Sequence, residues 1–260
     1  MSRIQLKHED DLTSFPNLVW LTQRNNRVAL ACLSEVYDLS SLDEMVGKLR
    51  QANVKGLEEK YAQDVEHNRD LEWFCSEMRF AILLKERHYD KRNASGSIQF
   101  IKRVPKRKTP DLCSEIEHHT VFFEITQLRD EMISVPPPAT LEEATRSSET
   151  PLGEIVKAFD SKLREKIDQA ASVEAPFVLV AESHRTWNSG FVLEHIRPCI
   201  EALVPPQTRI SALILLYPPG QIANSQGLLA RPLGIIVVNQ KSTYPLGTNV
   251  GTAVEDMLEM

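Results

Sequence analysis

Two stretches of the chain carry apolar residues at the spacing of three and four that is typical of helices. Residues 71–89 contain no glycine or proline, and their pattern predicts the first core helix. Residues 154–171 repeat the pattern, and one face of this second helix carries Ile155, Phe159, Leu163 and Ile167. A third helix is predicted over 189–203, with a kink near Pro198 because proline lacks a backbone N–H donor.

Short apolar or alternating segments between these helices predict strands. The predicted strands cover 97–104, 111–117, 120–128, 177–181, 210–217 and 233–240. The first three form an antiparallel meander, and the fourth is a continuous apolar run, which is typical of a strand covered on both faces. The order is therefore helix, three strands, helix, strand and additional elements, and it predicts an α/β fold.

Two segments stand outside this pattern. Residues 1–65 predict a separate, small helical region, with helical character over 27–37 and a capping box, Ser41-Leu-Asp-Glu44, that opens a helix to Gln51. Helical packing and partner contact are both open as its role. Residues 129–153 contain three consecutive prolines and little periodicity, which predicts a surface loop or lid. We therefore expect a main domain over 66–260 that contains this loop.

Composition places the chain among ordinary globular proteins. It has 260 residues, of which 42% are hydrophobic and 25% charged. Its apolar runs are far shorter than the roughly 20 residues that cross a bilayer, and no signal-peptide pattern opens it. We expect a cytoplasmic protein that does not bind membranes. The four cysteines form no C-x-x-C pair, which argues against a zinc ribbon or a disulfide framework and predicts buried thiols.

Charge is unevenly distributed. The formal net charge of −6 excludes binding of nucleic acid through bulk electrostatics, so such binding needs a local patch. One basic run does precede Asp111, and it consists of Lys102, Arg103, Lys106, Arg107 and Lys108. This run could hold a phosphate backbone; the alternative is an ordinary solvated surface.

Glu124 interrupts the apolar segment 120–128. Alternation along the strand places it on one face with Phe122, Thr126 and Leu128. A buried carboxylate needs a cation or hydrogen-bond donors, and Asp111 at the start of the neighbouring strand is another acid. Two facing carboxylates repel each other unless a metal joins them, and their oxygen ligands suit Mg²⁺ or Mn²⁺. The alternative is a core carboxylate paired with an arginine.

A third acid, Glu77, lies on the first core helix with apolar residues at three and four positions on either side. It could join the other two acids. The alternative is that it pairs with an arginine or lysine elsewhere, or extends to solvent.

The combination of Pro110-Asp111 with Glu124-Ile125-Thr126, thirteen positions after the aspartate, resembles the PD-(D/E)XK phosphodiesterase superfamily. The resemblance covers roughly residues 66 to 217. It implies a restriction-endonuclease-like core of the order αβββαβ, a mixed sheet flanked by helices. The small helical N-terminal region and the last strands are additions to this core.

The resemblance also implies a function. Asp111, Glu124 and the Ile125 carbonyl would bind Mg²⁺ or Mn²⁺, and Glu77 would correspond to the acid that many members carry on the first helix. The expected activity is metal-dependent hydrolysis of nucleic acid phosphodiester bonds, with DNA favoured over RNA. Cutting both strands of a duplex would favour a homodimer.

The sequence departs from the family pattern at Thr126, which stands where the motif has lysine. A substitute could come from Lys162 or Lys166 on the second core helix, which form a stripe with Gln169 beside the apolar face, or from Lys108. The alternative for the helix lysines is a solvated edge. If no substitute exists, the chain would be a catalytically inactive domain that binds nucleic acid or protein. A purely structural role would place Asp111 and Glu124 apart.

Overall fold

The computed structural model describes residues 14–22, 39–67, 71–90, 96–102, 104, 108–128, 149–183, 190–204, 207–216, 223–224, 227–228 and 234–258. The chain divides into two compact units, Met1–Arg107 and Lys108–Met260. The boundary drawn from sequence at 65/66 lies inside the first unit. Each unit is described by itself.

The first unit is mainly helical. Its elements are α1 (Pro16–Thr22), α3 (Leu39–Gln51), α4 (Leu57–Tyr61), α5 (Leu71–Leu83) and the short strand β1 (Ile98–Phe100). Helix α4 continues as a π-helical segment over Ala62–His67, and α5 continues as another over Leu84–Asp90. The helices expected over 41–51 and 71–89 are confirmed, whereas the segment 27–37 lies outside the described residues.

Asp43 joins two helices of the first unit. Its carboxylate accepts the backbone N–H groups of Asn17 and Leu18, each at 2.8 Å, in the first turn of α1. N–H groups at the start of a helix have no intrahelical partner, so this side chain caps α1 from the neighbouring helix α3.

The strand expected over 97–104 is limited to three residues in β1. Its backbone pairs with Lys55, whose N–H donates to the Ile98 carbonyl at 3.1 Å and whose carbonyl accepts from Phe100 at 2.9 Å. The next residue, Gly56, has φ +77°, and a Cβ there would lie 2.5 Å from the Phe100 carbonyl oxygen. Only glycine allows this close approach without strain.

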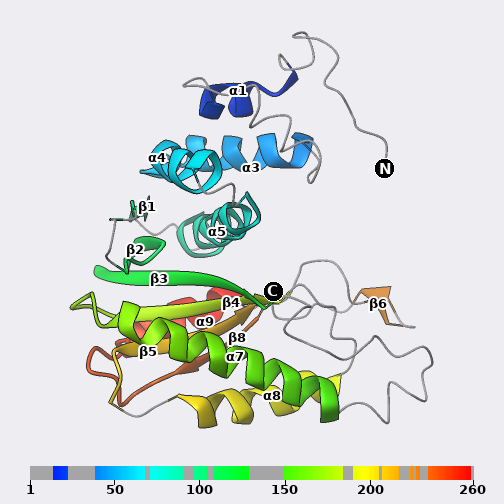
Figure 1. The fold of residues 1–260 in the computed structure, drawn as a ribbon, viewed down its shortest axis with the longest axis vertical. Coiled ribbons are helices and arrows are strands. Elements are labelled where there is room, and N and C mark those ends of the chain that lie inside the picture. The colour runs from blue at the N-terminus through cyan, green and yellow to red at the C-terminus, as the bar shows by residue number, and fades with distance from the viewer. Residues whose placement is uncertain are drawn as a thin grey trace. The chain divides into compact units, whose positions relative to one another are not determined.

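The second unit is built on a mixed sheet. Its strands lie side by side in the order β2 (Leu112–Ile116), β3 (His119–Leu128), β4 (Phe177–Ser183), β5 (Ile210–Leu216) and β8 (Gly234–Val238) (Figure 1). Strands β3, β4 and β5 are parallel, and β2 and β8 are antiparallel to their neighbours. Glu117 and His118 form the tight β2–β3 turn with positive φ. The predicted α/β class with a mixed open sheet is confirmed.

Two crossover helices cover one face of this sheet. Helix α7 (Glu149–Ala170) joins β3 to β4, and α8 (Gly190–Leu203), which contains Pro198, joins β4 to β5. Figure 1 shows the two helices side by side along the sheet. Between helices and sheet lies an apolar cluster that includes Phe159, Leu163, Leu179, Ile200 and Leu213.

Helix α7 starts at Glu149, five residues before the predicted start. Residues 149–153, expected to be loop, are therefore helical. The prediction was wrong there because these polar residues show little apolar periodicity, whereas Pro151 is compatible with the first turn of a helix, where a proline gives up no intrahelical hydrogen bond. The rest of the expected loop, residues 129–148, lies outside the described part of the chain.

Helix α9 (Thr248–Leu258) covers the opposite face of the sheet and was not predicted. A Cβ on its Gly251 would lie 3.9 Å from the side chain of Val238 on β8. The side chains of Ile235 and Val237 point to the other face of β8, where they join the apolar cluster under α7 and α8. The second unit is thus a sheet with helices on both faces. A small hairpin of β6 (Ala223–Asn224) and β7 (Gly227–Leu228) lies between β5 and β8 in sequence. Among the described residues, no helix has the length and apolar character needed to span a membrane.

Candidate functional site

The backbone of β2 and β3 brings Asp111 and Glu124 together. The register pairs Leu112 with Phe123, so the residue before β2 lies beside the residue after Phe123. The Asp111 charge is close enough to raise the pKa of Glu124, and the two residues are almost completely buried, with 2% and 3% exposed. Asp111 Oδ2 also accepts the backbone N–H of Ile125 at 2.9 Å. A purely structural interaction protein was expected to have these two residues apart, whereas the register places them side by side.

Pro110 limits the β2–β3 ladder beside Asp111. Continued by two residues, the β2–β3 register would place position 110 opposite Ile125. Proline has no N–H to donate to the Ile125 carbonyl, so the ladder cannot extend there. Because the N–H and C=O groups of one strand residue point to the same edge, the Ile125 carbonyl is directed to the edge at which Asp111 lies. The register thus directs a third oxygen to the edge of β3 at which Asp111 lies.

Helix α7 supplies two hydrogen-bond donors to Glu124. Lys166 Nζ donates to Glu124 Oε1 at 2.7 Å. Gln169 Nε2 donates to Glu124 Oε2 and to the Thr109 carbonyl. Residues three apart share one face of a helix, so a single turn of α7 holds both oxygens of the carboxylate. Glu124 therefore faces α7, as the predicted alternation requires, and its cation is a lysine rather than the arginine considered above.

Burial and charge shift the ionisation of this cluster. Burial raises the pKa of Glu124 well above its usual value of 4.5, and the Asp111 charge raises it further, although Lys166 acts in the opposite direction. Burial lowers the pKa of Lys166, but the carboxylates of Glu124 and Asp111 outweigh it, so the pKa of Lys166 lies above its usual value. Lys166 is therefore protonated at neutral pH. With both carboxyl groups ionised, the cluster would carry one net negative charge, and a further cation would favour that state by neutralising it.

The other candidate lysines have different partners. Lys162 Nζ binds Glu165 at 3.0 Å, one turn of α7 before Lys166. Lys108, which is 56% exposed, binds the exposed Asp168 at 3.4 Å. Thr126, which stands in the position of the motif lysine, is fully buried. Lys166 is thus the candidate lysine that the fold brings onto the acids.

Glu77 has a cation of its own in the first unit. Its carboxylate lies 3.0 Å from Lys60 Nζ, which also binds Asp64 at 3.2 Å. All three side chains are buried, with no more than 1% exposed. Glu77 therefore pairs with a lysine, which was the alternative to its joining Asp111 and Glu124.

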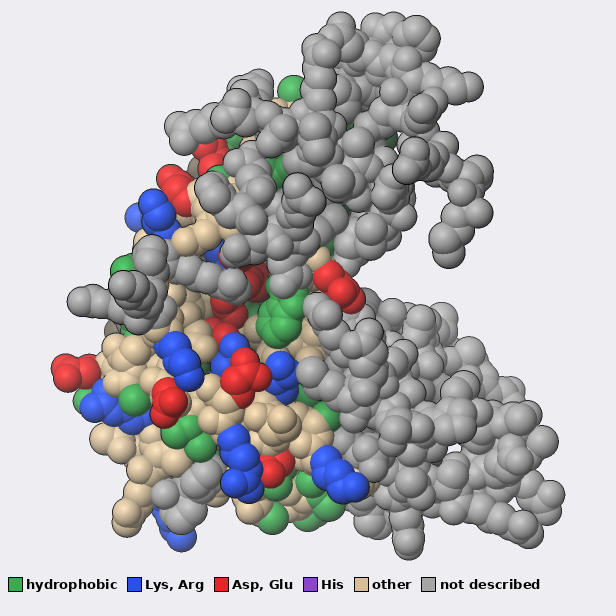
Figure 2. All heavy atoms as spheres, viewed as in Figure 1, with side chains coloured by type: hydrophobic (Ala, Val, Ile, Leu, Met, Phe, Trp, Pro, Cys, Tyr) green, Lys and Arg blue, Asp and Glu red, His purple; other side chains and the backbone are tan. Residues whose placement is uncertain are grey.

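The basic run is described only in part. Arg103, Lys106 and Arg107 lie outside the described residues, whereas Lys102 and Lys108 are exposed. Figure 2 shows basic and acidic side chains interspersed on the coloured surface of this face. On α7 itself, Arg164 pairs with Asp160 at 2.9 Å. Within the described part of the chain, this face carries mixed charge rather than one continuous basic patch.

The donor set at Asp111 fits a hard divalent cation. No group of three or more His, Cys, Asp or Glu side chains placed to hold a metal occurs among the described residues. Mg²⁺, however, keeps several waters and commonly takes only one or two carboxylates together with substrate phosphates. Asp111, Glu124 and the Ile125 carbonyl supply oxygen ligands of that kind. These residues could therefore hold Mg²⁺ or Mn²⁺.

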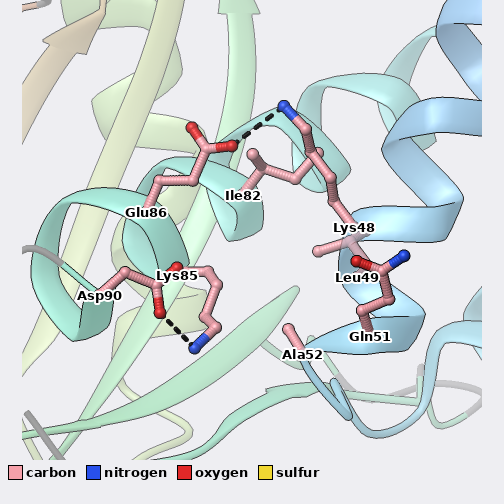
Figure 3. Close-up of a pocket in the computed structure, with 8 residues that line it drawn as sticks. All are labelled: Lys48, Leu49, Gln51, Ala52, Ile82, Lys85, Glu86 and Asp90. Atoms are coloured by element: carbon pink, nitrogen blue, oxygen red, sulfur yellow. Dashed lines mark hydrogen bonds and ion pairs between the residues drawn. The ribbon is translucent and has the colours of Figure 1, made fainter. Parts of the chain in front are cut away.

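A surface pocket of about 190 Å³ lies in the first unit, between α3 and the end of α5 (Figure 3). Lys48 binds Glu86 there at 3.0 Å, and Lys85 binds Asp90 at 2.6 Å. The hydrogen bond to Glu86 raises the pKa of Lys48. The pocket is smaller than the roughly 300 Å³ at which small-molecule sites begin, and its charges pair with one another. It is a weaker candidate than the acid pair.

The thiols and Gln169 show where sequence reasoning was incomplete. Cys75 is buried as predicted, but Cys113 and Cys199 are only half-buried, and Cys32 lies outside the described residues. Gln169 was part of the predicted stripe with Lys162 and Lys166, but it was not named as a site residue.

Comparison with known proteins does not assign this arrangement to a family. No protein-family model, no curated protein and no solved structure matches the chain.

Proposed function

We propose that this protein is a metal-dependent nuclease that hydrolyses nucleic acid phosphodiester bonds, built on a restriction-endonuclease-like core of the PD-(D/E)XK type. One observation carries the proposal: Lys166 of α7 contacts Glu124, which itself interacts with Asp111. The PD-(D/E)XK motif combines two acids with a lysine, and here Thr126 stands in the position of that lysine. Lys166 would supply the missing positive charge beside the two acids. Lys166 belongs to helix α7 rather than to β3, but its ammonium group contacts the carboxylate of Glu124.

Each residue has a role that follows from its contacts. Asp111, Glu124 and the Ile125 carbonyl would hold Mg²⁺ or Mn²⁺, which when bound lowers the pKa of coordinated water and neutralises charge on the phosphate. Lys166 is protonated, so it cannot accept a proton from water. It would instead stabilise negative charge that develops on the attacked phosphate.

The basic run and Glu77 also belong to the proposal. The basic run at 102–108 would bind the phosphate backbone, with DNA favoured over RNA, and a homodimer would cut both strands of a duplex. Glu77 is kept as an auxiliary acid in this proposal, while its pair with Lys60 accounts for it equally well as a structural residue.

A second candidate function is a catalytically inactive domain that binds nucleic acid or protein. Its support is the engagement of both Glu124 oxygens by Lys166 and Gln169 at a side chain that is only 3% exposed. An acid pair so enclosed could serve the fold alone.

A cleavage assay separates the two. The substrates are supercoiled plasmid, single-stranded DNA and structured RNA, each with Mg²⁺, with Mn²⁺ and with a chelator. We expect metal-dependent cleavage by the native protein, none by Asp111→Asn, and a severe loss in Lys166→Met. Lys162→Met is the matched control, because it makes the same change one turn away on α7 and should retain activity. Equal behaviour of the native protein and Asp111→Asn on every substrate would refute the nuclease and favour the binding domain.

A further inference from the structure

We propose that Gln169 is a positioning residue that sets the geometry of the Asp111–Glu124 pair for a divalent cation. This inference rests on the proposed function, because it assumes that the pair holds a metal. Its basis is the double donation from Gln169 Nε2, to Glu124 Oε2 and to the Thr109 carbonyl.

The chemistry of the two partners requires an amide nitrogen at this place. A carboxylate and a backbone carbonyl are both acceptors, and the amide of glutamine provides two N–H donors on one atom. Glutamate in the same position would offer only acceptors when ionised. The Gln169 side chain is 7% exposed, so water cannot readily replace these hydrogen bonds.

The two contacts tie together the segments that carry the two acids. Glu124 belongs to β3, whereas Thr109 lies two residues before Asp111 in the segment leading into β2. One side chain of α7 therefore links the strand that carries Glu124 to the segment that carries Asp111. A change at Gln169 would alter the separation of the carboxylates without removing either of them.

Gln169 also differs from Lys166 in charge. Both donate to Glu124, one to each oxygen, so together they fix the orientation of the carboxylate. Lys166 does so with a positive charge, which repels an incoming cation, whereas the neutral amide leaves the negative charge of the carboxylate available. Neutral partners that orient metal ligands in this way typically change metal affinity by about 10- to 100-fold when removed.

The test is a calorimetric titration of Mn²⁺ into the full chain, at a temperature well below its unfolding transition. The variants are Gln169→Met, which keeps the length and helix propensity but removes the donors, Asp111→Asn as the loss of a ligand, and Arg164→Gln as an exposed control on α7. We expect the Mn²⁺ dissociation constant to rise about 10- to 100-fold in Gln169→Met, to become unmeasurable in Asp111→Asn and to stay unchanged in Arg164→Gln.

The outcomes distinguish the inference from the function on which it rests. If the native protein binds Mn²⁺ and Gln169→Met binds it equally well, Gln169 has only a structural role, even if the variant has a lower Tm. If the native protein does not bind Mn²⁺, or Asp111→Asn binds it as well as the native protein does, both the metal site and this inference are overturned. Should Gln169→Met fail to fold, Gln169→Asn replaces it, since the shorter amide cannot span both acceptors and should also weaken binding.

Discussion

Replacement of Lys166 by methionine tests the central contact of the site. The change removes an ammonium group 2.7 Å from Glu124 and leaves two buried carboxylates without it. At an effective dielectric constant of about 20, the lost attraction over this distance is roughly 6 kcal/mol, and relief from burying the ammonium offsets part of it. Removal of one partner from a buried ion pair typically costs about 3–5 kcal/mol. We adopt the lower bound of about 3 kcal/mol because Lys166 is partly exposed.

The stability lost in Lys166→Met should depend on pH. The pKa of Glu124 in the folded protein is raised above its usual value of 4.5, first by burial and then by Asp111. A carboxyl group with a raised pKa binds more protons in the folded than in the unfolded state, so stability falls as pH rises from the unfolded to the folded pKa. Without Lys166 the pKa of Glu124 rises further, and the fall in stability extends to higher pH. The penalty should therefore be largest at neutral and alkaline pH and should vanish on acidification towards the usual carboxyl range.

Thermal unfolding provides the assay. For a chain of this size, about 3 kcal/mol corresponds to a fall in Tm of roughly 6–12 °C near pH 8, and little change is expected near pH 5. Excess Mg²⁺ should raise the Tm of Lys166→Met more than that of the native protein, because the ammonium no longer competes with the metal. Stabilisation by a ligand at a hundredfold excess over its dissociation constant is about 2.7 kcal/mol.

The control is Arg164→Met, which loses a contact with Asp160 at an exposed position of α7 and should cost no more than about 1 kcal/mol. A cost of less than about 1 kcal/mol for Lys166→Met, or a cost that does not change with pH, would refute the assignment of Lys166 as the counter-ion of a buried carboxylate pair.

Three further substitutions have defined outcomes. Glu124→Gln keeps only one acceptor oxygen for Lys166 and Gln169, so the free energy of unfolding at neutral pH should fall by about 1–3 kcal/mol and stabilisation by Mg²⁺ should be lost; an unchanged Tm would contradict the double donation to this carboxylate. Lys60→Met should lower the unfolding free energy of the first unit by about 3–5 kcal/mol in urea, because Glu77 loses its buried cation, and Lys60→Arg should restore part of it. Asp43→Ala should cost about 1 kcal/mol by uncapping α1, and hydrogen exchange of the first turn of that helix should accelerate; unchanged exchange would mean that the cap is not formed in solution.

Hydrophobic pattern was enough to predict the elements that are long and strongly periodic. The α5 helix, the β3 strand and the α8 helix lie where the pattern placed them, because their apolar residues follow the period of the element. The start of α7 was missed because residues 149–153 were counted with the preceding segment of low periodicity, and α9 was missed although its buried residues Val250, Ala253, Val254 and Met257 recur at helical spacing. The unit boundary at 107/108 depends on contacts between distant residues and leaves no local mark in the sequence.

The sequence also predicted some features of the candidate site and not others. Alternation on β3 predicted that Glu124 and Thr126 share a face, and the stripe on α7 identified Lys162 and Lys166 together as candidates. Sequence could not choose between these lysines, since both lie on the same edge of the helix and only the crossing of α7 over β3 decides which one reaches the carboxylate. For the same reason it could not identify Gln169 as the link between Glu124 and Thr109.

By itself, then, the sequence determined the class of fold, the apolar faces and the presence of acids inside an apolar strand, because each of these depends on the local period of the chain. Tertiary structure decided which charges meet: Glu124 with Asp111 and Lys166 in the second unit, and Glu77 with Lys60 in the first. Ion pairs between distant residues depend on side-chain reach across packed elements. A burial cost that one residue incurs can be offset by a partner 42 positions away, and no local pattern records that partner.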